Sequence, residues 1–241
     1  MVFVTNAIVL HNADYKDYDR MVTLFSPVHG RIDAIARGCR RPKSALMGVT
    51  DMFCAGEYTI TEAADRRSIT QCQLKESFYN IRFDYDKLTH ACYCLSLADT
   101  AVLPDQPADA LFYLLLETLT FLADSDLPNE LMTSAFEMRF MHVNGFTPQM
   151  KYCVSCGAPV EGDCRFDEEK GGVICSMCKS SAPRISDMAR RIILKSSVSP
   201  YRNIPLLKDH EEWKEAARLF RPFVERRIDR RFRTTVPDLP D

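Results

Sequence analysis

The sequence contains no apolar run that approaches the ~18–20 residues needed for a membrane-spanning helix. Its first stretch, MVFVTNAIVLHNADY, lacks both a basic leader and a small-residue cleavage site. We interpret this stretch as a β-strand of the mature protein and not as a signal peptide. These absences predict a cytoplasmic protein without a membrane partner.

Sequence motifs of several enzyme classes are also missing. There is no Gly-x-x-x-x-Gly-Lys-Ser/Thr phosphate loop, no Gly-x-Gly-x-x-Gly after a strand and no Gly-x-Ser-x-Gly elbow. The five histidines are dispersed, and none has a neighbour in the sequence that would make it a general base. The sequence therefore predicts a protein that is not an enzyme, and we assign no catalytic residue.

What the chain does have is enough apolar material for a core and an uneven distribution of charge. It has 241 residues, of which 46% are hydrophobic and 27% charged, with a net charge of −2. The balance is +4 over residues 16–43, −7 over residues 99–130 and +5 over residues 218–233. Charge segregated in this way creates local fields that the net charge does not reveal.

The first eighty residues resemble a series of short β-strands. Strands are predicted around residues 2–10, 20–25, 32–37, 53–61 and 68–78, with turn signals between them. Five strands in about eighty residues favour a small closed barrel, and the OB-fold is the first candidate.

From residue 84 the apolar spacing becomes helical. Helices are predicted from residue 84, over 108–122, from a cap at Asp126 or Asn129 to Asn144-Gly145, from a cap at Ser186 or Asp187, and over about 209–229. The second of these is apolar on almost all sides and is expected to be buried. The acidic middle of the chain is interpreted as core scaffold.

Two Cys-x-x-Cys pairs lie between these helical segments. Cys153 and Cys156 are followed, after eighteen intervening residues, by Cys175 and Cys178. This spacing is typical of a zinc site in which four thiolates complete a tetrahedron. We predict one structural Zn²⁺, because four thiolates leave no open position for catalysis. A vestigial or redox-active cluster remains the alternative.

The other six cysteines are scattered, and we expect them to behave as small core residues. They are Cys39, Cys54, Cys72, Cys92, Cys94 and Cys164.

The stretch RGCRRPKSAL, residues 37–46, concentrates positive charge next to a glycine and a proline. Gly38 and Pro42 make it a poor helix and predict a loop that follows a strand. Cations on a loop of a small barrel suit a polyphosphate partner, because each neutralised phosphate releases counterions. A solubilising surface loop is the alternative interpretation.

Two segments of the sequence resemble the RecO family of bacterial recombination and repair mediators. The first is AIVLHNADYKDYDRMVTLFSPVHGRIDAIARGCRRPKSAL, and the second is FEMRFMHVNGFTPQMKYCVSCG with the later GGVICSMC. The resemblance implies an α+β protein. An OB-fold β-barrel in residues 1–80 would precede an α-helical domain in residues 81–241, with the zinc module inserted at about 150–182.

The resemblance also implies a function and partners. RecO-like proteins bind single- and double-stranded DNA, anneal complementary strands and work with RecR. Together they help RecA to replace single-strand-binding protein, whose acidic, hydrophobic C-terminal tail is expected to enter an apolar pocket of the helical domain. The implied location is the bacterial cytoplasm, at the nucleoid.

Three basic surfaces and some aromatic residues are the candidates for DNA contact. Phe25, Phe53 and Tyr58 are the candidate stacking residues. The candidate DNA-binding cations are Arg20, Arg31, Arg37, Arg40, Arg41, Lys43, Arg190, Arg191, Lys195, Arg226, Arg227 and Arg230, with Arg231 and Arg233 next to the last of these. A solvated surface is the alternative for each group.

Two other functions are kept as alternatives. One is a zinc-ribbon nucleic-acid-binding module in transcription or ribosome assembly, and the other is an unrecognised enzyme. Salt-dependent binding to unstructured oligonucleotides of mixed sequence favours the mediator. A requirement for one defined site or a structured RNA favours the zinc ribbon, and turnover that depends on a single histidine or carboxylate favours the enzyme.

Overall fold

The computed structural model describes residues 1–64 and 66–228, which form two compact units. One unit contains residues 1–85 and 95–119, and the other contains residues 86–94 and, among the described residues, 120–228. Helices α1 (Tyr85–Ala101) and α2 (Asp109–Asp124) contribute residues to both. The division into domains 1–80 and 81–241 stays a prediction.

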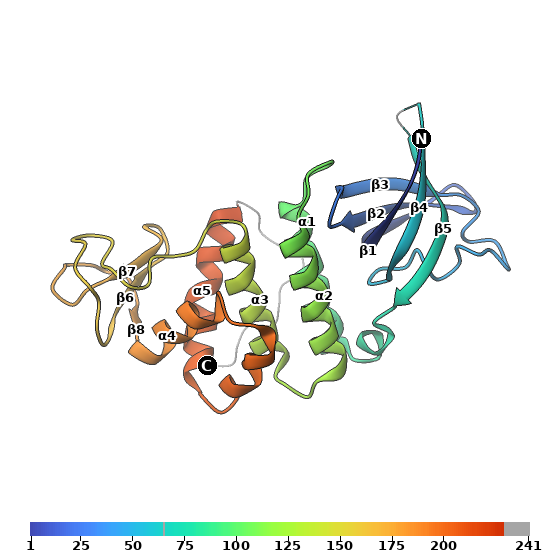
Figure 1. The fold of residues 1–241 in the computed structure, drawn as a ribbon. Helices are drawn as coiled ribbons and strands as arrows, with labels where there is room; N and C mark the ends of the chain where they lie inside the picture. The colour runs from blue at the N-terminus through green and yellow to red at the C-terminus, as the bar shows by residue number, and fades with distance from the viewer. Residues whose placement is uncertain (65, 229–241) are drawn as a thin grey trace. The chain divides into compact units, whose positions relative to one another are not determined.

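The N-terminal strands close into a five-stranded barrel (Figure 1). The strands are β1 (Val2–Tyr15), β2 (Asp19–Ser26), β3 (Gly30–Ala36), β4 (Ala55–Ala63) and β5 (Arg66–Glu76). They are ordered β1-β2-β3-β5-β4, with β1 pairing with β4 through its first half and with β2 through its second. Only the pair β3–β5 is parallel. The predicted OB-like barrel is confirmed.

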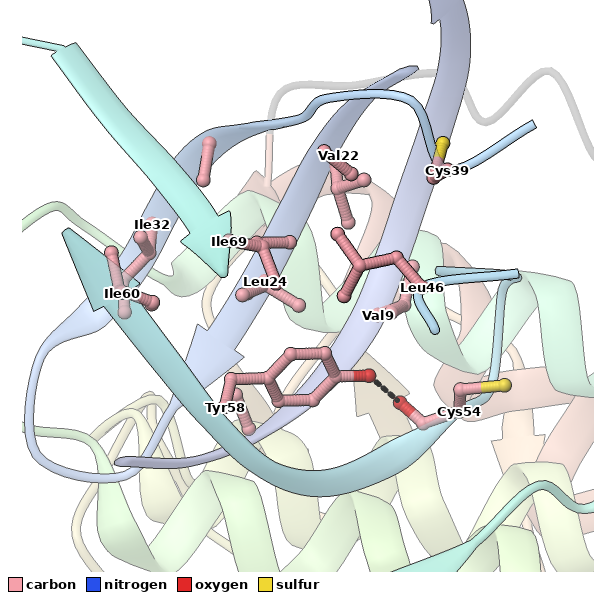
Figure 2. Close-up of a cluster of buried hydrophobic side chains, with 13 residues drawn as sticks. Val9, Val22, Leu24, Ile32, Cys39, Leu46, Cys54, Tyr58, Ile60 and Ile69 are labelled. Carbon is pink, nitrogen blue, oxygen red and sulfur yellow. Dashed lines mark hydrogen bonds between the residues drawn. The ribbon is translucent and has the colours of Figure 1, made fainter. Parts of the chain in front are cut away.

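Alternating apolar side chains fill the barrel (Figure 2). In β3, Ile32, Ala34 and Ala36 face inward, as a half-buried strand with a period of two requires. Leu46, from the long loop between β3 and β4, is buried in the same cluster. The hydroxyl of Tyr58 donates to the Val49 carbonyl oxygen at 2.8 Å, so this buried polar group has a partner.

The C-terminal half is mainly helical. Besides α1 and α2 it contains α3 (Asn129–Val143), α4 (Asp187–Ser196) and α5 (Glu212–Ile228), and two 3₁₀ helices, η1 (Tyr79–Phe83) and η2 (Tyr201–Leu207), precede α1 and α5. The predicted cap at Ser186 is confirmed, because its hydroxyl accepts from the Ala189 amide. The predicted cap of α3 is wrong, since Pro128 precedes that helix and no side chain caps it.

A small three-stranded sheet accompanies the cysteine segment. Its strands β6 (Cys164–Asp167), β7 (Gly172–Ile174) and β8 (Arg184–Ile185) are ordered β7-β6-β8. Because β7 ends directly before the second cysteine pair, the sheet fixes where that pair begins. Across the described ranges 1–64 and 66–228, no helix has the length and apolar character needed to cross a bilayer.

The six scattered cysteines lie where small core residues are expected. Cys39, Cys54, Cys94 and Cys164 are buried, while Cys72 and Cys92 are half-buried. Burial raises the pKa of Cys54 and of Cys164 to about 11 each, which keeps both thiols protonated and unreactive at neutral pH.

Candidate nucleic-acid interface and metal centre

The four cysteines of the two pairs converge on one point. Their sulfur atoms all lie within 4.8 Å of one another, with 3.9 Å between Cys153 and Cys178 and 3.7 Å between Cys156 and Cys175. A tetrahedral Zn²⁺ with bonds of about 2.3 Å would hold its sulfurs about 3.8 Å apart. The donor set and its spacing therefore fit a structural metal ion.

Backbone geometry brings the two pairs together. Cys153 and Gly157 form a tight turn, in which the Gly157 amide donates to the Cys153 carbonyl oxygen at 2.8 Å and Gly157 has a φ of 76°. A Cβ on Gly172 would lie 2.6 Å from the Gln149 carbonyl oxygen, so only glycine allows this approach of the two segments.

Backbone amides stabilise negative charge at one of the sulfurs. Burial opposes ionisation of Cys153, but the amides of Cys175, Cys156 and Ser155 outweigh it and lower the pKa of Cys153 to about 6. Hydrogen bonds with the thiols of Cys156 and Cys175 raise the pKa of Cys178 to about 12, and the charge on Cys153 adds to this effect. A cation is needed for all four sulfurs to be deprotonated together.

The predicted basic loop is a turn-rich segment that follows β3. Arg37, Arg41 and Lys43 are exposed on it, and each lies more than 4.0 Å from every carboxylate among the described residues. The φ of Lys43 is 67°, in the left-handed region that non-glycine residues seldom adopt. Three cations therefore remain available to a ligand on this loop.

The loop is anchored to the hairpin between β1 and β2. The Gly38 amide donates to the Asp19 carboxylate at 2.8 Å, and the Arg40 amide donates to the Tyr18 carbonyl oxygen at 3.1 Å. The guanidinium of Arg41 lies 5.2 Å from the centre of the Tyr18 ring. The loop and the hairpin tip thus form one surface, which we call the loop–hairpin surface: residues 15–18 and 37–43.

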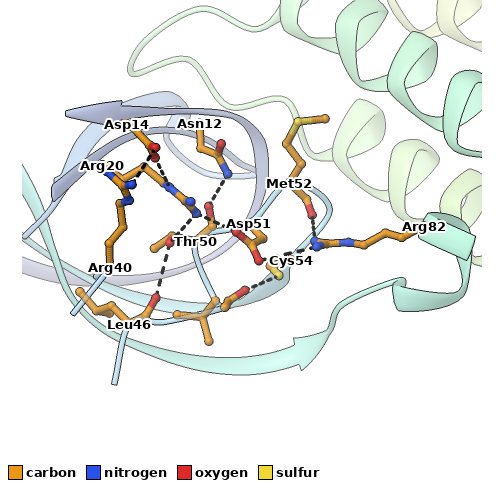
Figure 3. A network of polar contacts seen from close by, with 12 residues as sticks. Asn12, Asp14, Arg20, Arg40, Leu46, Thr50, Asp51, Met52, Cys54 and Arg82 are labelled. Carbon is orange, nitrogen blue, oxygen red and sulfur yellow. Dashed lines mark hydrogen bonds and ion pairs between the residues drawn. The ribbon is translucent and has the colours of Figure 1, made fainter. Parts of the chain in front are cut away.

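Arg20 belongs to a polar network at this end of the barrel (Figure 3). Its guanidinium contacts Asp51 at 2.7 Å and Asp14 at 3.3 Å, and Asp14 also pairs with Arg40 at 3.2 Å. Burial by itself lowers the pKa of Arg20, but these carboxylates raise it overall. Arg20 is therefore paired with carboxylates and stabilises this end of the barrel.

Arg31 is also paired with carboxylates. It pairs with Asp33 at 3.0 Å and with Asp99. The sequence could not distinguish these two arginines from the unpaired cations of the loop, because their partners lie up to 68 residues away along the chain. Their DNA contacts stay predictions.

The prediction that three aromatic residues of the barrel stack on bases is wrong, because these residues do not lie on the surface. Phe25, Phe53 and Tyr58 are all buried at 2% exposure or less, so no base can reach them. They face the interior because large apolar rings in barrel strands stabilise most when removed from water.

Exposed rings lie on the loop–hairpin surface instead, at Tyr15 and Tyr18, which are 42% and 49% exposed. Our sequence reasoning missed them. The signal was the polar turn Tyr-Lys-Asp-Tyr-Asp, in which aromatic residues alternate with charges and have no apolar neighbour to pack against.

Of the three cations predicted on helix α4, two are exposed. Arg190 is only 7% exposed and donates to the Met150 carbonyl oxygen at 2.9 Å, so it is not part of an exposed basic face. Arg191 pairs with Asp187 at 2.6 Å yet is largely exposed, and Lys195 is exposed. Arg190 also pairs with Asp187, three residues before it on the helix.

Arg191 and Lys195 border a pocket of about 470 Å³. Its apolar lining includes Ile192 and Ile204, which are buried, and Leu207, which is half-buried, while His210 in the lining is exposed. The pocket thus combines an apolar floor with a basic rim.

The predicted basic face of α5 is partly neutralised. Arg226 pairs with Glu169 at 3.1 Å, and the guanidinium of Arg227 lies 5.0 Å from the centre of the Phe223 ring. Arg230, Arg231 and Arg233 lie outside the described residues. Contact of this face with DNA stays a prediction.

The sequence was also compared with known families. Residues 1–78 match the model for the N-terminal part of recombination protein O, and residues 82–235 match the model for its C-terminal part. Together the two models cover nearly the whole chain.

Individual relatives agree with the family models. The chain is 33% identical over 192 residues to the DNA repair protein RecO of Acetivibrio thermocellus, covering 78% of this chain and 76% of the relative. It is 30% identical over 242 residues to the DNA repair protein RecO of Desulforamulus reducens, covering 97% and 93%. With an OB-like barrel, a helical unit and clustered cysteines already in place, the chain belongs to the RecO family of DNA repair proteins.

Proposed function

We propose that this chain binds single- and double-stranded DNA, anneals complementary strands and, together with RecR, assists the loading of RecA onto DNA covered by single-strand-binding protein. Membership of a DNA repair family supports the general role. We further propose that it acts by binding and not by catalysis, at the nucleoid in the bacterial cytoplasm.

The observation on which this proposal rests is the loop–hairpin surface. Three unpaired cations, Arg37, Arg41 and Lys43, lie on the same surface as the exposed ring of Tyr18. Proteins that bind single strands combine cations, which neutralise phosphates, with rings on which bases stack. Annealing also requires neutralised charge, since two phosphate backbones must approach each other.

The test is a charge reversal on the loop, Arg41→Glu/Lys43→Glu, in the full chain. We expect weaker binding to a single-stranded oligonucleotide of mixed sequence, measured by fluorescence anisotropy at several salt concentrations. The slope of log affinity against log salt should become shallower by about 0.7 for each lost phosphate contact. Annealing of oligonucleotides precoated with single-strand-binding protein should slow in parallel.

The matched control is Arg66→Glu/Lys75→Glu, which makes the same charge change on strand β5. We expect nearly unchanged affinity and slope for this variant. Equal effects of the two double variants would mean that only net charge matters, and that the loop–hairpin surface is not the DNA site.

We propose that the clustered cysteines hold one structural Zn²⁺. The sulfur-only donor set favours zinc among the common cellular metals. Four protein ligands leave no open coordination position, which suits a structural role. Cys153, Cys156, Cys175 and Cys178 would be its ligands.

We propose that the pocket beside α4 accepts the acidic, hydrophobic C-terminal tail of single-strand-binding protein. Its apolar floor suits the hydrophobic end of such a tail, and Arg191 and Lys195 suit the acidic part. A fluorescent tail peptide should bind the protein, and Lys195→Glu should weaken that binding severalfold. Lys208→Glu, which changes a neighbouring exposed lysine that does not line the pocket, is the control. Equal binding to both variants would exclude this pocket.

A further inference from the structure

A buried histidine lies among carboxylates in the helical unit, apart from the cysteine cluster. His90 is on α1, and one of its nitrogens lies with one oxygen each of Asp86 and Glu130 so that all three atoms are within 4.8 Å of one another. Asp86 and His90 are one helical turn apart, and Glu130 is in the first turn of α3.

The imidazole of His90 has one nitrogen without a hydrogen-bond partner among the described residues. The side chain is 0% exposed, and the orphaned atom is Nε2, which lies 3.7 Å from Asp86 Oδ1. A buried polar atom without a partner costs free energy, so its retention next to two carboxylates calls for an explanation.

Neighbouring groups already orient the histidine and one carboxylate as metal ligands usually are. Nδ1 of His90 lies 2.8 Å from Thr133 Oγ1, and a proton on Nδ1 would leave the Nε2 lone pair directed toward Asp86. The Asn129 amide donates to Asp86 Oδ2 at 2.5 Å and holds this carboxylate in place.

We propose that Asp86, His90 and Glu130 form a second metal site, which binds a divalent ion of the Zn²⁺ class through one nitrogen and two carboxylate oxygens. The imidazole nitrogen favours Zn²⁺, Ni²⁺ or Fe²⁺ over Mg²⁺ and Ca²⁺, which prefer oxygen ligands. Three protein ligands leave a fourth position for water. The bound ion would join α1 to the start of α3.

The donor atoms need only a small adjustment to reach bonding distance. An ion with bonds of about 2.1 Å holds tetrahedral ligands about 3.4 Å apart. The pair of His90 and Asp86 is close to this value at 3.7 Å, and the upper limit for the set is 4.8 Å. Rotation of the partly exposed Glu130 side chain can close the remaining gap.

The experiment measures zinc content of the untagged full chain after equilibration with buffered Zn²⁺. We expect two equivalents in the wild type and one in Glu130→Gln or Asp86→Asn, while Cys175→Ser loses the other equivalent. The control Asp126→Asn, an exposed acid near α3 but outside the cluster, should keep two. In the wild type, Zn²⁺ should raise the melting temperature beyond the increase seen in Glu130→Gln.

Both carboxylate variants keep the shape of the side chain at partly or fully exposed positions, so folding should persist and can be checked by circular dichroism. A single equivalent in the wild type would overturn the second site. A second equivalent that survives both Glu130→Gln and Asp86→Asn would also overturn it. Neither outcome bears on DNA binding by the loop–hairpin surface.

Discussion

The buried carboxylate of Glu137 shows how strongly neighbouring residues affect the ionisation of a side chain. Glu137 on α3 is 0% exposed, accepts from the Tyr93 hydroxyl at 2.6 Å and pairs with Arg221 at 3.0 Å. Burial raises the pKa of Glu137 above its usual value, even though Arg221 and Tyr93 favour the charged form. Arg221 is therefore the residue that makes a charge at this position tolerable.

Replacing that partner should destabilise the helical unit. We expect Arg221→Ala to lower the free energy of unfolding by ~3–5 kcal/mol at pH values above the raised pKa of Glu137, because the buried carboxylate then loses its counter-charge. Between about pH 4.3 and that raised pKa, the folded state holds a proton on Glu137 that the unfolded chain has released, so stability should fall as the pH rises through this range. Urea denaturation at several pH values measures both effects.

Glu137→Gln in the Arg221→Ala background is the matched control. It keeps the truncated arginine but removes the titrating group, so this pH dependence should disappear. A pH dependence that persists in the double variant would assign it to another residue.

Also at the residue scale, Tyr18→Ala should weaken binding of single-stranded DNA by ~1–3 kcal/mol, the contribution of one stacked base. Tyr18→Phe should bind like the wild type, because it keeps the ring. The control Tyr79→Ala removes another exposed ring from η1. Anisotropy titrations in which Tyr18→Ala and Tyr79→Ala behave alike would rule out stacking on Tyr18.

These residues mark the limit of prediction from the sequence. Composition and spacing identified the basic loop and all four clustered cysteines, since both features are local. The burial of Arg190, the exposure of Tyr18 and the pairing of Arg20 with Asp51 depend on residues far away in the sequence, so no local pattern could predict them.

At the scale of elements, the small sheet β6–β8 packs Phe166 against Phe223 of α5, and the adjacent cysteine cluster is expected to stabilise the sheet further. We expect Cys175→Ser to lose one equivalent of zinc and to lower the melting temperature, because a structural metal contributes directly to folding. DNA affinity per folded molecule should change little, since the loop–hairpin surface belongs to the other compact unit.

Cys92→Ser is the control for this variant. It removes a half-buried thiol outside the cluster and should leave the zinc content unchanged. Equal zinc content in Cys175→Ser and the wild type, measured by atomic absorption, would contradict the four-thiolate site.

At the scale of the whole molecule, the location of the charges matters more for binding a polyanion than their sum. A chain with a net charge of −2 can still attract a polyanion, because unpaired cations gather on one surface while other arginines are neutralised by carboxylates. The net charge therefore gives no guidance on DNA binding here.

The separation into two compact units leads to a prediction of additivity. Combining Arg41→Glu/Lys43→Glu with Cys175→Ser should give the DNA affinity of the first variant and the melting temperature of the second, since the two sites belong to different compact units. Thermal melts and anisotropy titrations on all the variants measure this. A marked departure from additivity would show that the zinc module and the barrel are energetically coupled.

The sequence by itself determined the order of the elements, the five-stranded barrel and the cysteine pairs, because period, turn residues and ligand spacing act over a few residues. Only the tertiary structure decided which cations remain unpaired, which aromatic rings are exposed and how Asp86, His90 and Glu130 meet. Those properties arise when segments dozens of residues apart pack together, and burial and pairing then change the chemistry of each side chain.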